Sequence, residues 1–150
     1  GMRNPRRIRS AKRADAARLA RLSAQLGYAT TAGRVAGRLR RVQAARGRAV
    51  FVADVGGSAK GFVEVQERGP LLVDGGADAE VIGLVVDAGL RRSGLARALM
   101  ARAESWARAR GCRTLRVRTN VVRLDAHAFY EALDYAKVKT QTVYQKALKR

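Results

Sequence analysis

The sequence predicts one α/β domain of 150 residues, in which helices cover both faces of a mixed sheet. Apolar residues recur every three or four positions in some segments and every second position in others, so helices and strands alternate along the chain. The expected order is β-α-α-β-β-β-α-β-α-β, with room for one more strand. The composition, 47% hydrophobic and 29% charged, is typical of a globular domain.

The first third of the chain predicts a short strand around Ile8 and then two helices. Asp15 lies in the first turn of the first helix, and Gly27 ends that helix. Thr31 caps the second helix, and Gly47 ends it. Each helix carries one apolar stripe, made of Leu19, Leu22 and Leu26 in the first and of Val35, Leu39 and Val42 in the second. Each helix therefore has a face that can pack on a sheet.

Three strands are predicted in the middle of the chain. Residues 49–53 are β-branched and aromatic, and residues 61–65 alternate between apolar and other side chains. Gly56, Gly57 and Ser58 lie between these two runs and indicate a hairpin. Residues 81–86 are almost continuously apolar, as expected of a strand that is buried on both faces.

The last third predicts a helix over residues 94–110, with Gly111 just after its end. Residues 113–119 then alternate, so Leu115 and Val117 share one face of a strand while Arg116 and Arg118 share the other. A short helix is expected over residues 125–133. One or two final strands are expected within residues 138–148.

Composition narrows the classes of function. The net charge of +19 suggests nucleic-acid binding, but aromatic residues are only 5% and no basic–aromatic strip occurs, so nucleic acid is not the expected partner. No apolar run reaches membrane-spanning length, and no secretory signal is recognised. The only cysteine, Cys112, cannot form an internal disulfide, which fits a cytoplasmic location, and it is expected to be structural. No residues have metal-ligand spacing, so no metal is expected.

The turn that follows residues 81–86 is the most informative part of the sequence. The predicted strand ends, turns and enters a helix through the small residues Gly94 and Ala96. Unpaired N–H groups and the positive end of the helix dipole meet there, and the lack of bulk lets a pyrophosphate approach the backbone. Three arginines add positive charge to the turn, namely Arg91, Arg92 and Arg97. The turn therefore predicts a phosphate-binding site, although it is neither a Walker loop nor the three-glycine dinucleotide motif.

This turn resembles the signature of the GNAT superfamily of N-acetyltransferases, Gln/Arg-x-x-Gly-x-Gly/Ala, which reads Arg91-x-x-Gly94-x-Ala96 here. Residues 80–86 resemble the family's central strand. Asn120 and residues 126–135 resemble its second motif, except that Asp134 stands where the family usually has Gly. Asp tolerates a left-handed conformation better than most residues do. The likeness extends over residues 8–148, and it looks strongest to small bacterial members that include aminoglycoside 6′-N-acetyltransferases.

The resemblance implies a three-layer α-β-α fold with a mixed, mostly antiparallel sheet. Two central parallel strands, 81–86 and 113–119, would splay apart around acetyl-CoA. Backbone groups of residues 84–86 would pair with the pantetheine arm, and an N–H near Val85 would stabilise the oxyanion. The implied cofactor-binding residues are Leu84, Val85, Val86, Arg91, Arg92, Ser93, Gly94, Leu95, Ala96, Arg97, Asn120 and Phe129.

Two catalytic residues follow from the same resemblance. Tyr130 matches the family's usual general acid, which protonates the leaving CoA thiolate, while Phe129 beside it is the better core residue. The alternative for Tyr130 is an ordinary core or surface tyrosine. Many relatives carry an acid where this chain has Ile82 and Gly83, so Glu80 is the best available base, directly or through water. The alternative for Glu80 is a solvated carboxylate at the start of a strand.

The expected function is direct transfer of an acetyl group from acetyl-CoA to a primary amine. Residues 69–90 contain no Lys or Arg but do contain acids, and the resemblance places the loop before the central strand on the acceptor side, which predicts a small cationic acceptor. These acids are Asp74, Asp78, Glu80 and Asp87. The alternative for this stretch is a solvated acidic loop. The alternatives are acetylation of a protein N-terminus or lysine, a basic nucleic-acid or ribosome-associated module, and an acyl-CoA sensor without turnover. A homodimer is also left open.

Overall fold

The computed structural model describes residues 6–68, 78–118 and 124–149. The chain divides into two compact units, Gly1–Arg118 and Thr119–Arg150. The expectation of one domain remains a prediction. No helix in the described part of the chain is long and apolar enough to cross a membrane.

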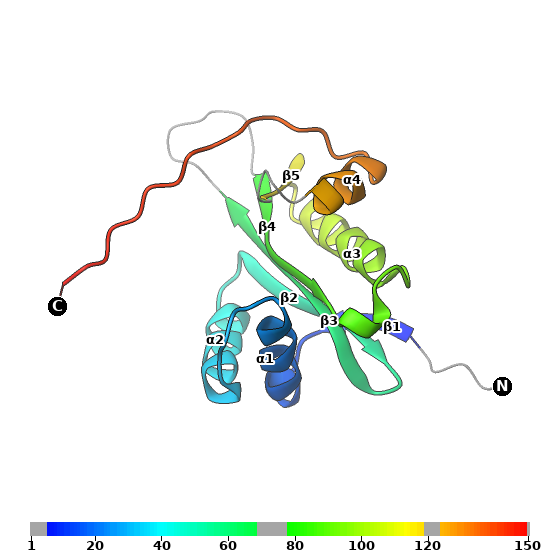
Figure 1. Ribbon diagram of the computed structural model, residues 1–150, viewed down its shortest axis with the longest axis vertical. Helices are drawn as coiled ribbons and strands as arrows, with labels where there is room; N and C mark the ends of the chain where they lie inside the picture. Colours follow the sequence, from blue (N-terminus) through cyan, green and yellow to red (C-terminus); the bar gives the residue numbers. More distant parts are fainter. Residues whose placement is uncertain (1–5, 69–77, 119–123, 150) are drawn as a thin grey trace. The chain divides into compact units, whose positions relative to one another are not determined.

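The first unit is built on a mixed sheet of five strands in the order β1-β2-β3-β4-β5 (Figure 1). The strands are β1 (Arg6–Ser10), β2 (Arg48–Val55), β3 (Ser58–Arg68), β4 (Asp78–Val86) and β5 (Thr114–Val117). Neighbouring strands are antiparallel except β4 and β5, which are parallel. This confirms the predicted mixed, mostly antiparallel sheet.

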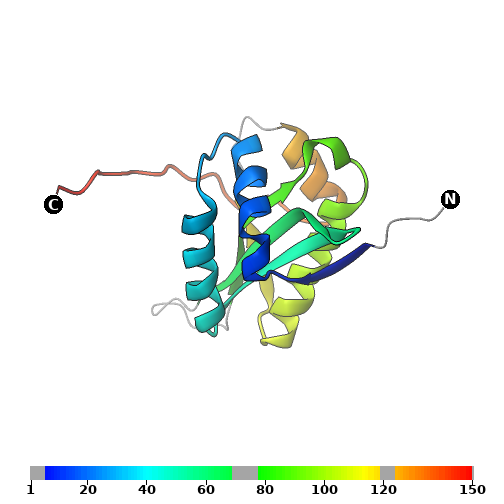
Figure 2. The same cartoon turned by 90° about the horizontal axis from the view of Figure 1, so that it is seen from below.

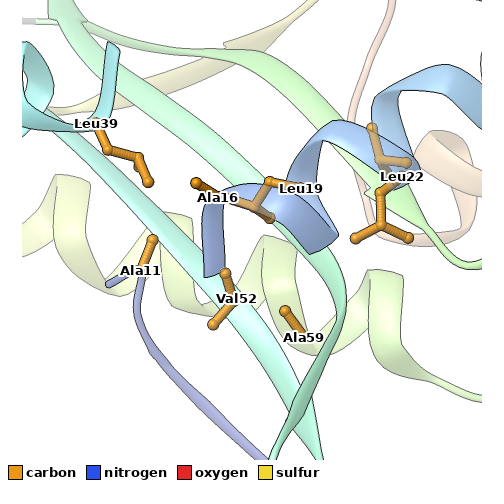
Figure 3. Packing of buried hydrophobic residues seen from close by; sticks show 8 residues of the cluster. Ala11, Ala16, Leu19, Leu22, Leu39, Val52 and Ala59 are labelled. Carbon is orange, nitrogen blue, oxygen red and sulfur yellow. The ribbon is translucent and has the colours of Figure 1, made fainter. Parts of the chain in front are cut away.

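Helices cover both faces of this sheet (Figures 1 and 2). On one face lie α1 (Ala16–Gln25) and α2 (Ala32–Ala44), and on the other lies α3 (Leu95–Ala109). The predicted apolar stripes form the core beneath α1 and α2, where Leu19, Leu22 and Leu39 pack with Val52 of β2 (Figure 3). Burial of such side chains is worth about 1.5–3 kcal/mol each, which fixes the helices to the sheet.

Turns and caps follow the sequence signals with two corrections. Gly56 and Gly57 both have positive φ and close the β2–β3 hairpin, and the Thr31 side chain accepts a hydrogen bond from Arg34 N–H at 3.2 Å. However, α2 ends at Ala44 rather than at Gly47, because Ala45 is already extended. Asp15 lies in a 3₁₀ turn before α1, not in the first turn of the helix.

Asp15 belongs to an ion cluster that joins β1 to the helical layer. Arg9 binds Asp15 through two nitrogens, at 2.8 and 2.9 Å, and Asp54 of β2 through Nε at 2.8 Å. Backbone N–H groups of Lys12 and Gly57 donate to the same two carboxylates. Arg9 is only 13% exposed, so this cluster is closed to solvent.

The second unit contains α4 (Leu124–Ala132) followed by an extended tail. Asp134 after the helix has φ 68°, which is the left-handed position predicted for it. The final strands expected within residues 138–148 are absent from the described residues 124–149, and Val138, Val143 and Tyr144 are exposed. A strand requires a hydrogen-bonded neighbour as well as suitable side chains, so alternation in this tail did not suffice.

Candidate functional site

The central strand β4 is irregular at Ile82. Val81 pairs with Val65 of β3 and Gly83 pairs with Glu64, so Ile82 is an extra residue without a partner on β3. Such a bulge bends a strand and interrupts its ladder. Ile82 is also 43% exposed, unlike the residues around it. The apolar run of residues 81–86 does not predict this bulge.

The parallel pairing of β4 with β5 stops at the same place. It runs from Asp78 with Thr114 to Val81 with Val117, and β4 then continues to Val86. Among the described residues, no strand pairs with this last part of β4 on the β5 side. Residues 82–86, including Leu84, Val85 and Val86, therefore form an open strand edge in the described part of the chain, and the divergence of the two strands stays a prediction.

A tight turn joins this open edge to α3. It consists of a 3₁₀ turn (Ala88–Leu90), Arg92 with φ 64° and Gly94 with φ 88°. Leu90 N–H donates to the Asp87 carbonyl at 2.9 Å, and the Ser93 hydroxyl donates to the Leu90 carbonyl. The left-handed conformation explains the glycine, because other side chains are strained at such φ values.

The first turn of α3 presents its amides without a side-chain cap. Ala98 N–H makes the first helical bond, to the Gly94 carbonyl at 3.0 Å, so the N–H groups of Leu95, Ala96 and Arg97 precede the helical ladder. A Cβ placed on Gly94 would meet no atom within 4 Å, so the space above the turn is open. Arg91 and Arg92 are exposed beside it, as is Arg97. These features make an anion-binding helix start.

Helix α1 holds the turn in place, which sequence reasoning missed. Arg18 binds Asp87 and the Ala59 carbonyl, both at 3.2 Å, and Gln25 accepts a hydrogen bond from Ala88 N–H at 3.0 Å. The Asp87 carboxylate also accepts the N–H of Gly89. That hydrogen bond, together with Arg18, lowers the pKa of Asp87, so the Asp87 carboxylate stays ionised at neutral pH. Side chains more than sixty positions apart give no local signal in the sequence.

Glu80 is neither solvated nor free. Its carboxylate accepts a hydrogen bond from Arg118 Nε at 2.7 Å and forms an ion pair with Arg68 Nη1 at 2.9 Å, and the side chain is only 7% exposed. The solvated alternative for Glu80 is therefore wrong. The role of Glu80 as a base stays a prediction. As a base, Glu80 would accept the amine's proton on a carboxylate that already contacts two guanidinium groups.

The other acids of the region are also engaged. Asp78 accepts a hydrogen bond from the Thr114 hydroxyl, and Asp87 is bound by Arg18. Asp74 lies outside the described residues. A cationic acceptor is predicted because these carboxylates would attract it. The three described carboxylates, however, already have partners within the protein.

The remaining predicted site residues lie in the second unit. Tyr130 and Phe129 are half-buried on α4, with their ring centroids 5.1 Å apart, and Tyr130 also contacts Tyr135 at 5.9 Å. Asn120 lies outside the described residues. Their placement against the strand edge and the turn stays a prediction.

Two further chemistries find no support. Burial beside Glu67 raises the pKa of the Cys112 thiol, so the cysteine is not activated as a nucleophile. No group of three His, Cys, Asp or Glu side chains in residues 6–68, 78–118 and 124–149 could hold a metal ion.

A hollow of about 740 Å³ lies away from the turn, on α2, and its lining includes Arg34, Arg38 and Arg41.

An open strand edge that leads into an anion-binding helix start is the arrangement of a protein that binds an elongated, phosphate-bearing cofactor. The model of the acetyltransferase (GNAT) family matches residues 20–135, and the chain belongs to this family.

Solved structures share the fold. A transcriptional regulator from Bacillus halodurans C-125 is 20% identical, with a TM-score of 0.85, over 95% of this chain and 100% of that chain. The aminoglycoside N-acetyltransferase AAC(6′)-Iy in complex with CoA is 20% identical, with a TM-score of 0.84, over 97% of each chain. Glucosamine-6-phosphate N-acetyltransferase from Arabidopsis thaliana is 18% identical, with a TM-score of 0.82, over 94% of this chain and 98% of that chain. A search of the curated proteins finds no match.

Proposed function

We propose that this protein is an N-acetyltransferase that moves an acetyl group directly from acetyl-CoA to the primary amine of a small molecule. The observation that carries the proposal is the continuous path from the open edge of β4 to the uncapped start of α3. Membership of the GNAT acetyltransferase family supports the same conclusion.

The path suits the two chemically different parts of CoA. The pantetheine arm contains amides, and backbone groups of Leu84, Val85 and Val86 along the open edge would pair with them as a strand does. The pyrophosphate would lie on the amides from Arg92 to Arg97, with the exposed arginines supplying additional positive charge. The thioester would then lie beside the open edge of β4, residues 82–86.

The reaction needs few groups. The amine nitrogen attacks the thioester carbon, a C–N bond forms, and the C–S bond breaks after the carbonyl oxygen has carried negative charge. An N–H near Val85 would stabilise that oxyanion, and holding both reactants together supplies much of the rate. Tyr130 would give its proton to the departing CoA thiolate, with Asn120 and Phe129 beside the cofactor arm. The amine's proton would leave to Glu80 or to water.

The phosphate site is tested at Ala96, in the first turn of α3. Gly94 is unsuitable because its left-handed φ would strain a new side chain. Ala96→Glu places a carboxylate where the pyrophosphate belongs but suits the helix dipole, so the protein should fold. Ala96→Gln is the matched neutral control. By calorimetry, acetyl-CoA should bind the Glu variant at least about tenfold more weakly than the Gln variant, a difference of about 1.4 kcal/mol. Equal affinities would remove the phosphate site from this turn.

The role of Tyr130 is tested by Tyr130→Phe. Loss of a general acid should lower kcat about 10²–10⁴-fold while leaving acetyl-CoA binding unchanged. Thiol release measures turnover, and calorimetry measures binding. Tyr135→Phe, which alters a hydroxyl on the neighbouring ring, is the control. If Tyr130→Phe keeps full turnover with chemistry rate-limiting, the proton comes from another group.

A further inference from the structure

Helix α2 packs on the sheet through one face and presents an arginine-rich face to solvent. Leu39 and Val42 are buried, whereas Arg34, Arg38 and Arg41 are exposed. Residues three and four positions apart lie on one side of a helix, so these three arginines form a row along α2. Figures 1 and 2 show α1 beside α2 on the same face of the sheet. The arginine row is thus an accessible surface of the first unit.

The charge of this row is not compensated nearby in the sequence or in the described contacts. Residues 16–53 contain eight arginines and neither Asp nor Glu. Each acid described in the first unit contacts other partners, so no ion pair joins a described acid to Arg34, Arg38, Arg40 or Arg41. The segments outside the described residues contain a single acid, Asp74, which could not neutralise four arginines.

The second unit does not supply the missing negative charge either. Residues 119–150 contain three acids but six lysines and arginines, so this unit is itself positive. The arginine row therefore keeps a net positive charge that an anionic partner could neutralise.

The row borders the hollow of about 740 Å³ on α2. The described lining extends from Thr30 to Ala44, which corresponds to about 20 Å along a helix. Gly33 and Gly37 belong to this lining. A Cβ on Gly33 would meet no atom within 4 Å, and one on Gly37 would meet only the end of the Arg40 side chain at 3.8 Å. The hollow is therefore elongated, and no side chain fills it at the two glycines.

An extended, acidic polypeptide segment fits these features. Alternate side chains of an extended chain lie on one face about 7 Å apart, and successive arginines of the row rise by about 4.5–6 Å, so several carboxylates can each reach a guanidinium. The two glycines allow a polypeptide backbone to approach the helix. The described lining contains no aromatic side chain on which bases could stack and no large apolar side chain that could enter a membrane.

We propose that the arginine row and the hollow of α2 form a docking surface for an extended, acidic segment of a partner protein. Carboxylates of that segment pair with Arg34, Arg38 and Arg41, and Arg40 adds positive charge. This surface does not depend on the proposed acetyl transfer, because it lies away from the turn before α3.

The test is the binding of a fluorescein-labelled octapeptide of glutamate to the full chain. Fluorescence anisotropy is measured at about 0.15 M salt, where charges more than about 8 Å apart are largely screened. An octapeptide of glutamine is the neutral control, and it should bind at least about tenfold more weakly. The nine-nucleotide oligomer dT9, with eight phosphates, represents a nucleic acid of equal charge.

The triple variant Arg34→Gln, Arg38→Gln and Arg41→Gln should bind octaglutamate about tenfold more weakly than the wild type. Glutamine is a good helix former, so the variant should fold, which circular dichroism checks. The control is the triple variant Arg108→Gln, Arg113→Gln and Lys146→Gln, which removes three exposed charges outside α2. The control should weaken octaglutamate binding less than twofold.

Gly33→Gln separates the hollow from its charge. The variant keeps every arginine and improves helix propensity but places a side chain in the hollow. It should weaken octaglutamate binding about threefold. Unchanged binding would show that charge alone attracts the peptide, which would overturn the hollow as a docking surface.

Three other outcomes would overturn the proposal while leaving acetyl transfer untouched. Octaglutamate could fail to bind, or the two triple variants could lose equal affinity for it. The arginine-row variant could also lose more affinity for dT9 than for octaglutamate, which would make nucleic acid the partner. Equal, small losses of dT9 binding in both triple variants would support the proposal, because total charge alone then attracts the oligonucleotide.

Discussion

Two ion clusters in the first unit are opposites. In one, Arg9 lies between the carboxylates of Asp15 and Asp54; the two carboxylates are buried, and the Arg9 side chain is 13% exposed. In the other, Glu80 lies between the guanidinium groups of Arg68 and Arg118, and only the carboxylate is buried. The first cluster has two acids for one base, and the second has two bases for one acid.

The difference shows how burial decides what the same chemistry contributes to stability. Around Arg9, backbone N–H groups of Lys12 and Gly57 also donate to the two carboxylates, so each carboxylate has a second partner besides the guanidinium. Around Glu80, the two arginine side chains are 41% and 53% exposed. Exposed pairs contribute little to stability, so this cluster should stabilise the fold less than the buried one does.

The largest expected effect comes from breaking the closed cluster. Arg9→Met would leave two buried carboxylates unpaired and should lower the free energy of unfolding by about 3–5 kcal/mol. Arg118→Met should lower it by less than about 1 kcal/mol, because Arg118 is half exposed. Urea denaturation at pH 7 measures both. Similar losses in the two variants would contradict the contrast between a buried cluster and a half-exposed one.

The pH dependence of stability should also show the contribution of the Arg9 cluster. The hydrogen bonds from Arg9 lower the pKa of Asp15 and Asp54 in the folded protein. A lowered folded pKa means that the stabilisation is complete above the unfolded value of about 3.9 and is lost as the pH falls below it. The free energy of unfolding should therefore fall between pH 5 and pH 3, and less steeply in Asp15→Asn. Glu104→Gln on the surface of α3 should follow the wild type, and an Asp15→Asn profile parallel to the wild type would argue against the linkage.

A third ion pair, which is intermediate in exposure, should have a smaller effect on stability and should also affect the binding of acetyl-CoA. Arg18 and Asp87 are 25% and 23% exposed, and they join α1 to the turn before α3. Arg18→Met should cost roughly 1 kcal/mol of stability and weaken acetyl-CoA binding severalfold, because the turn loses its brace. Arg21→Met, an exposed change on the same helix, should do neither. Unchanged acetyl-CoA affinity in a folded Arg18→Met protein would show that the turn holds itself.

Local signals predicted most elements of the fold, because they act within a few residues. Glycines closed the β2–β3 hairpin, Thr31 capped α2, and Gly111 follows α3 with φ 80°. The final strands failed as a prediction, since pairing depends on a neighbour that alternation does not supply. Of the site, the small residues and arginines of the turn were visible in the sequence, whereas Arg18 and Gln25 were not.

The sequence by itself determined where most of the helices and strands form and predicted where a phosphate would be bound, because periodicity, glycines and a helix start are local properties. Only the tertiary structure decided the bulge at Ile82, the end of β4–β5 pairing and the partners of Glu80. Those features depend on register between strands and on contacts such as Arg118 with Glu80, thirty-eight positions apart. Charge counted along a segment shows which acids are present, but only the folded chain shows which of them are already neutralised.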